Sequence, residues 1–147
     1  MRKTDRYQAI VLRRRNVGEA DQLITVFTKE VGKLVVRARG IRQPQAKLVG
    51  YLEPFSEVRL YLTEGKRYAL VTGVEPLGEH QLDPLFIFGI KFFFIELIDS
   101  FFLEHDPHPR VYRGLKEALE LISRGEDGRV VTAFALLIIR EAGFAPV

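Results

Sequence analysis

The chain has 147 residues, 47% of them hydrophobic and 28% charged, so it can bury a core as one domain or as two small ones. It contains no cysteine, which excludes a disulfide framework, a thiol nucleophile and a cysteine-ligated zinc within these residues and suits a reducing cytoplasm. The formal net charge is +3, but residues 1–50 hold 12 Lys and Arg against 4 Asp and Glu. This local excess predicts a polyanion site in the first third of the chain.

Five short stretches in the first half are rich in strand-forming residues and are separated by turns. They are residues 7–15, 22–28, 33–39, 55–63 and 67–75. The longest gap, residues 41–50, contains Pro44 and shows no apolar period, which predicts a loop. Five strands with one long loop after the third favour an OB-type Greek-key barrel, and an open sheet or an SH3-like barrel is the alternative.

The apolar period beyond residue 80 is that of helices. Asp83 is the expected N-cap of the first helix, with Pro84 at its first position. That helix, residues 85–104, is apolar nearly all round, as is typical of a central helix packed on several sides. Two more helices are expected, one ending near Ser123 and one over residues 130–142.

The apolar stretch at residues 85–103 is long enough to raise the question of a membrane span. Lys91, Glu96 and Asp99 interrupt it, and charges are costly inside a bilayer, so we expect a buried helix and no membrane contact. The chain is therefore predicted to be α+β. A five-stranded OB barrel is expected over residues 1–78, followed by a three-helix domain over residues 79–147.

The strand at residues 33–39 carries the clearest functional signal. Its alternation places Lys33, Val35, Arg37 and Arg39 on one face. Successive residues of that face lie about 6.6–6.8 Å apart, which is close to the spacing of phosphates along one nucleic-acid strand. Basic residues before and after this strand extend the track. The predicted DNA-binding residues are Arg13, Arg14, Arg15, Lys33, Arg37, Arg39, Arg42 and Lys47. The alternative is a solvated strand face whose charges serve solubility.

Other side chains carry weaker functional signals. Tyr7, Tyr51 and Tyr61 are candidates for stacking on bases, with barrel core as the alternative for each. His105 and His108 lie among prolines, which indicates a turn between helices rather than a metal site. The phenylalanines of residues 86–102 are expected in the core, with an apolar groove for a partner peptide as the alternative. Because the sequence shows no nucleophile–base arrangement or phosphate-binding glycine loop, we expect a non-catalytic protein without a cofactor.

Six stretches read together resemble the amino-terminal domain of the bacterial RecO family of DNA repair proteins, and the helices after Asp83 resemble its middle domain. The stretches are residues 7–12, 18–21, 27–28, 32–33, 37–40 and 52–55. The resemblance implies binding of single- and double-stranded DNA and annealing of complementary strands. It also implies a role with RecR in loading RecA onto strands coated by single-strand-binding protein, whose tail the helical region contacts.

Many members of that family carry a four-cysteine zinc module after the last helix seen here, and this chain has no cysteine. Zinc binding is therefore not carried over from the resemblance, and the chain resembles a truncated or naturally shortened member with weakened RecR binding or annealing. Two other functions stay open. A protein-interaction adaptor would bind its partner in a salt-tolerant way, and an RNA-binding OB module would prefer ribose.

Overall fold

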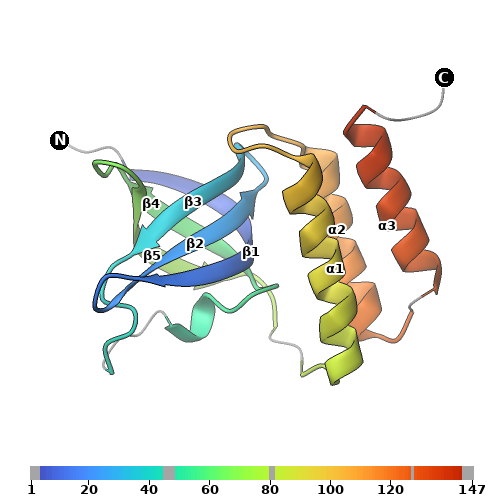
Figure 1. Cartoon of the computed structure of the whole chain (residues 1–147), viewed down its shortest axis with the longest axis horizontal. Helices are drawn as coiled ribbons and strands as arrows, with labels where there is room; N and C mark the ends of the chain where they lie inside the picture. Colours follow the sequence, from blue (N-terminus) through green and yellow to red (C-terminus); the bar gives the residue numbers. More distant parts are fainter. Residues whose placement is uncertain (1–3, 45–48, 80–81, 127, 144–147) are drawn as a thin grey trace.

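A β-barrel followed by three helices forms the computed structural model, which describes residues 4–44, 49–79, 82–126 and 128–143 (Figure 1). Its strands are β1 (Thr4–Val17), β2 (Asp21–Thr28), β3 (Gly32–Ala38), β4 (Glu57–Thr63) and β5 (Ala69–Pro76), with a short 3-10 helix, η1 (Val49–Tyr51), before β4. The barrel closes in the order β1-β2-β3-β5-β4, with β4 pairing back to β1 and β3 parallel to β5. This is the order of an OB fold, so the predicted barrel class is confirmed.

Side-chain alternation decides which residues of the barrel face inward. Leu34, Val36 and Ala38 of β3 are buried, whereas Lys33 and Arg37 are only partly buried, as the alternation of the sequence predicts. Strand β2 departs from this pattern because all residues from its third onward are buried. Ile24 and Val26 on its inner face belong to the cluster inside the barrel, and Phe27 on its outer face packs against the helices.

The three helices are α1 (Leu85–Phe101), α2 (Pro109–Ser123) and α3 (Gly128–Glu141), and they lie together on one side of the barrel (Figure 1). The predicted N-cap of α1 was wrong, because Pro84 occupies that position. The carboxylate of Asp83 instead lies 2.6 Å from the ammonium of Lys91, and the two side chains are only 4% and 5% exposed. A buried lysine needs a counter-charge, and this pair supplies it.

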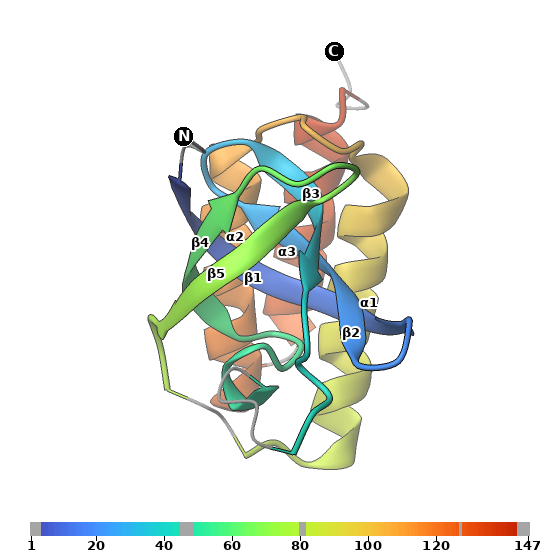
Figure 2. The ribbon, with the colours of Figure 1, turned by 90° about the vertical axis from the view of Figure 1, so that its left-hand side faces the viewer.

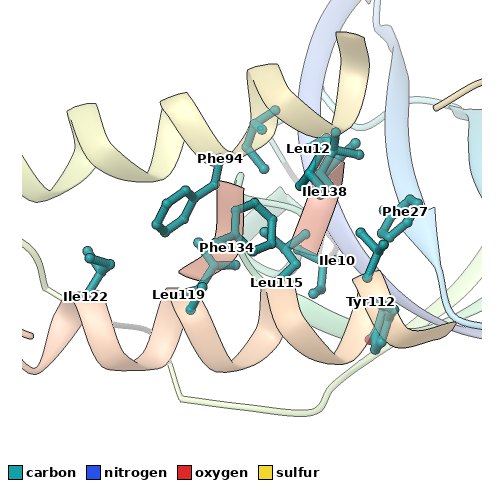
Figure 3. Packing of buried hydrophobic residues seen from close by; sticks show 14 of the residues in the cluster. Ile10, Leu12, Phe27, Phe94, Tyr112, Leu115, Leu119, Ile122, Phe134 and Ile138 are labelled. Carbon is teal, nitrogen blue, oxygen red and sulfur yellow. The ribbon is translucent and has the colours of Figure 1, made fainter. Parts of the chain in front are cut away.

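The barrel and the helices share one hydrophobic core (Figure 3). Ile10, Leu12 and Phe27 project from the barrel into the helical cluster. The Phe27 ring centroid lies 6.3 Å from those of both Phe102 and Tyr112. A second cluster lies inside the barrel and is built mainly of β-branched residues and leucines. Because the first cluster draws on both halves, the helices are fixed against the outer face of β1 and β2.

One face of α1 is exposed although it is apolar. Leu85 is 87% exposed, Phe86 66% and Phe92 50%, whereas Phe94 and Phe102 are buried. The prediction that α1 is packed on several sides, with its phenylalanines in the core, is therefore wrong for this face. The barrel, α2 and α3 cover the rest of the helix. Among the described residues, no helix has both the length and the apolar character needed to cross a membrane.

Candidate nucleic-acid interface

Six of the eight predicted basic residues fall into two groups, and the first group, Lys33 and Arg13, joins the barrel to α1. The ammonium of Lys33 lies 3.1 Å from Oδ1 of Asp99, and the Lys33 side chain is only 13% exposed. The Arg13 guanidinium contacts the other oxygen of the same carboxylate. The backbone N–H of His105 also donates to the Lys33 carbonyl oxygen over 2.9 Å. At this end the face of β3 that the sequence assigns to nucleic acid is therefore occupied by the helical domain.

Arg14 and Arg15 point to different surroundings because they are neighbours on one strand. Arg14 is half-buried, and its guanidinium lies 3.2 Å from a carboxylate oxygen of Glu53. Arg15 is exposed and is paired across the sheet with Leu23, which in turn is paired with Arg37. Residues in one such row share a face, so Arg15 and Arg37 stand about 10 Å apart with one strand between them.

Arg37 belongs to the second group, which lies at the other end of β3, and Asp21 holds it in place. Its Nε and one terminal nitrogen donate to Oδ2 of Asp21 over 2.9 and 2.7 Å. The other oxygen of Asp21 accepts from the backbone N–H of Gly40 over 2.8 Å. This backbone hydrogen bond, and then Arg37, lower the pKa of Asp21 below its usual range. Asp21 thus holds the end of β3 and the segment after it in place through both of its oxygens.

The turn between β1 and β2 is tied to the segment that follows β3. The Arg42 guanidinium donates to the carbonyl oxygen of Gly18 over 2.6 Å. The backbone N–H of Arg42 donates to the Ala20 carbonyl oxygen over 2.9 Å. Arg42 remains exposed, so the same side chain braces the turn and adds positive charge to its surface. Lys47 lies outside the described residues.

Three residues that were not predicted from the sequence complete the second group: Lys66, Arg67 and Tyr68. Arg67 was expected in a strand, but β5 begins at Ala69 and residues 64–68 form the β4–β5 turn. A Cβ at Gly65 would overlap the Tyr68 carbonyl oxygen, so the chain folds tightly back on itself there. Two cations and a tyrosine in the turn between the fourth and fifth strands of an OB fold are a signal that the sequence offered.

Closure of the barrel brings this turn beside the end of β3. The seam consists of two parallel pairs, Val36 with Ala69 and Arg37 with Leu70. A pocket of about 320 Å³ lies here, lined by Arg37, Arg39, Gly65, Lys66, Arg67, Tyr68 and Leu70. Figure 2 shows that β5 and its turn lie on the side of the barrel that faces away from the helices. The pocket is therefore open to a ligand while the helices are in place.

The remaining cations of this region have no acidic partner among the residues that the structure describes. Within the described part of the chain, no carboxylate lies within ion-pair distance of Arg15, Arg39, Lys66 or Arg67. Together with Arg37 and Arg42 they form what we call the basic cluster: Arg15, Arg37, Arg39, Arg42, Lys66 and Arg67. Arg37 is paired with Asp21, and the other five cations form no ion pair among the described residues. Such an excess of positive charge on an OB surface creates a positive potential suited to a polyanion.

The other candidate aromatic residues have other roles. The Tyr61 hydroxyl donates to a carboxylate oxygen of Glu75 over 2.8 Å. Tyr7 is half-buried against the core of the barrel, and Tyr51 is 44% exposed on η1. None of these three lines the pocket of the basic cluster, whereas Tyr68 does.

A larger cavity of about 540 Å³ lies between the barrel and the helices, but its charges are mixed. Its lining includes Lys116, whose ammonium lies 3.3 Å from a carboxylate oxygen of Glu57. The Tyr112 hydroxyl donates to the other oxygen of Glu57 over 2.6 Å. Burial, and then this carboxylate, raise the pKa of Tyr112 far above its usual range. Because acids and bases compensate one another here, this cavity attracts a polyanion less than the basic cluster does.

The segment between α1 and α2 carries the two histidines. His108 Nε2 lies 2.9 Å from Oδ2 of Asp106, and its ring centroid lies 4.4 Å from that of Phe102. Both contacts fix the turn between the helices. Among the described residues, no three His, Cys, Asp or Glu side chains are grouped so that they could hold a metal ion.

A closed barrel in OB strand order, with basic turns and an appended three-helix unit, defines an OB-fold protein with a helical domain. The family model described as Recombination protein O N terminal matches residues 1–79, and the one described as Recombination protein O C terminal matches residues 87–147. The chain belongs to the RecO family. The resemblance read from the sequence is confirmed.

Curated relatives carry the name DNA repair protein RecO. The relative from Cutibacterium acnes is 33% identical, and the alignment covers 97% of this chain and 62% of the relative. The relative from Heliobacterium modesticaldum is also 33% identical, with 96% of this chain and 52% of the relative covered. The relative from Pelotomaculum thermopropionicum is 29% identical, with 95% and 55% covered. The chain thus spans about half to three-fifths of the length of these DNA repair proteins.

Proposed function

We propose that this chain is a non-catalytic DNA-binding unit of a recombination mediator, which binds single- and double-stranded DNA through the basic cluster. The observation that carries the proposal is the position of the cluster. It lies beside the β1–β2 turn, at the end of β3 and on the β4–β5 turn, and these two turns and the adjoining strand face are the elements that OB folds use to bind oligonucleotides. It also lies away from the helices, so DNA binding and partner binding are compatible on one molecule (Figure 2).

The residues of this proposed site differ from those that the sequence suggested. Arg37, Arg39, Arg15 and Arg42 stay in the site, and Lys66 and Arg67 are added to it. Lys33 and Arg13 have a different role in the proposal, because both are engaged by Asp99 at the barrel–helix junction. Their charges hold α1 in place rather than contact phosphates.

In this proposal the bound strands are annealed and the recombinase RecA is loaded with the help of RecR and of the tail of single-strand-binding protein. Family membership supports these steps, and phosphate contacts are compatible with annealing because they leave the bases of most of the strand free to pair. The exposed apolar face of α1, with Leu85, Phe86 and Phe92, favours an additional adaptor role in which a partner protein binds the helices.

The test is a fluorescence-anisotropy titration of labelled single-stranded DNA at several salt concentrations. If about four phosphates are neutralised, the log–log slope of affinity against salt is about −3, since each contact on a single strand contributes about −0.7. Arg39→Gln and Lys66→Gln should each make the slope less steep by about 0.7. Arg113→Gln on the exposed side of α2 is the matched control and should leave it unchanged.

Two results would contradict the proposal. One is the absence of DNA binding at low salt. The other is a slope that none of the basic-cluster variants alters. A ribonucleotide strand of the same length, titrated in parallel, distinguishes a DNA-binding unit from an RNA-binding one, because only ribose presents a 2′-hydroxyl.

A further inference from the structure

The pocket beside the β3–β5 seam has a lining that phosphate binding alone does not explain. Four of its seven lining residues are cations, and the others are Gly65, Tyr68 and Leu70. Tyr68 is the one aromatic residue in the lining, and Leu70 adds apolar surface. Phosphate recognition needs only the cations, so the tyrosine and the leucine indicate a ligand with a flat apolar part.

Tyr68 is placed together with a guanidinium. The Arg67 guanidinium carbon lies over the Tyr68 ring, 5.6 Å from its centroid. Nucleobases stack on tyrosine rings and on guanidinium planes alike. The volume of about 320 Å³ is at the lower end of the range for small-ligand pockets, about 300–1,000 Å³. A pocket of this size suits one base with its sugar and phosphate and excludes a base pair.

The charges around Tyr68 are arranged for a ligand that carries phosphate. Arg37 is fixed by Asp21, so this side of the pocket is preorganised. Arg39 is exposed and, within the described residues, forms no ion pair, as is also true of Lys66. A phosphate can therefore bind to either of these side chains without breaking an existing pair.

We propose that this pocket receives one unpaired nucleobase of a bound strand, with Tyr68 as its stacking residue, and that it makes the DNA site prefer single strands to duplex. The inference rests on the proposed function and concerns the same site. In a duplex the bases are paired and stacked, and taking one out costs a few kcal/mol. Duplex DNA therefore binds through phosphates alone, whereas a single strand gains the pocket in addition.

The experiment compares three labelled probes on the full chain: oligothymidylate of about 20 nucleotides, an abasic strand of the same length, and a duplex. The abasic strand keeps the phosphates and lacks the bases. The unaltered protein should bind oligothymidylate about tenfold more tightly than the abasic strand, as expected for a single stacked base. Tyr68→Ala should reduce this ratio to about one and leave the duplex affinity and the salt slope unchanged.

Two further variants distinguish the loss of base stacking from a change in the structure of the pocket. Tyr68→Phe keeps the flat ring and should keep the ratio, whereas Tyr68→Leu fills the space without a flat face and should lose it. Tyr51→Ala, at a 44% exposed tyrosine outside the pocket, is the control and should behave like the unaltered protein.

The outcomes separate the two proposals. If the unaltered protein binds both single strands equally well, the pocket does not bind a base, while DNA binding by the basic cluster stands. The same conclusion follows if Tyr68→Ala and Tyr68→Leu weaken all three probes alike. If the unaltered protein binds no probe at low salt, the proposed function and the pocket are both overturned.

Discussion

Replacement of Lys33 by methionine separates a structural cation from a DNA-binding one. Lys33→Met keeps the length of the side chain but removes its ammonium, which leaves Asp99 with Arg13 as its remaining cation. The carboxylate of Asp99 is 12% exposed, and the Arg13 side chain is 58% exposed. The variant is therefore expected to weaken the junction between the barrel and α1 and to leave DNA binding intact.

The size of the effect follows from burial. Loss of one partner from a fully buried ion pair costs about 3–5 kcal/mol, and exposed pairs contribute about 0–1 kcal/mol. A pair with side chains 12–13% exposed and a second cation in place lies between these limits, at about 1–3 kcal/mol. For a chain of this length, that free energy corresponds to a lower Tm by about 3–10 °C.

The assay combines thermal unfolding by circular dichroism with the salt dependence of single-strand binding. Lys33→Met should lower Tm and leave the salt slope unchanged. Arg39 is exposed and forms no ion pair in the described structure. Arg39→Met should therefore leave Tm unchanged and make the salt slope less steep by about 0.7. If Lys33→Met kept its Tm and altered the slope as Arg39→Met does, the assignment of Lys33 to the junction would be refuted.

Three further predictions concern the turns and the buried charges. Gly32→Ala should destabilise the protein by at least about 2 kcal/mol in urea unfolding. Gly32 has φ of 78°, and an added Cβ would lie 2.6 Å from the carbonyl carbon of Asp106. An unchanged urea midpoint would contradict this close contact. The pKa of Asp21 is lowered by the Gly40 N–H and then by Arg37, so its charge stabilises the fold fully above about pH 4, and this contribution is lost as the pH falls through the lowered pKa. Asp21→Asn should therefore be less stable at pH 7 and lose less stability than the unaltered protein below pH 4, and parallel pH profiles would rule this out. Lys91→Met should lower the free energy of unfolding by about 3–5 kcal/mol, because it leaves the Asp83 carboxylate buried without a counter-charge. Adding Asp83→Leu should restore much of this stability in the same unfolding assay. A double variant that is no more stable than the single one would contradict a stabilising role for the pair.

The alternation of β3 was predictable from sequence, but the surroundings of its outer face were not. Period two identified Leu34, Val36 and Ala38 as core and Lys33 and Arg37 as outward-facing, and the burial of these residues agrees. Whether an outward-facing residue meets solvent depends on what lies over the strand. Lys33 meets Asp99 of α1, which is 66 residues away in the chain, and no local pattern contains that contact.

In the candidate site, too, some residues were predictable from the sequence and others were not. Arg37 and Arg39 were identified because they alternate on one strand, whereas Lys66, Arg67 and Tyr68 were missed. They reach the site through the parallel seam between β3 and β5, which joins segments more than 30 residues apart. Knowledge of the OB strand order would have predicted this neighbourhood, because that order places the β4–β5 turn beside the third strand.

Local chemistry in the sequence determined the five strands, the three helices and the basic character of the first third, because each depends on neighbouring residues along the chain. Tertiary structure decided how that charge is used. Docking of α1 on the barrel pairs Arg13 and Lys33 with Asp99, and closure of the barrel gathers Arg37, Arg39, Lys66 and Arg67 around one pocket. It also decided that Leu85, Phe86 and Phe92 stay exposed, because a helix that is apolar all round does not specify which of its faces the neighbouring elements cover.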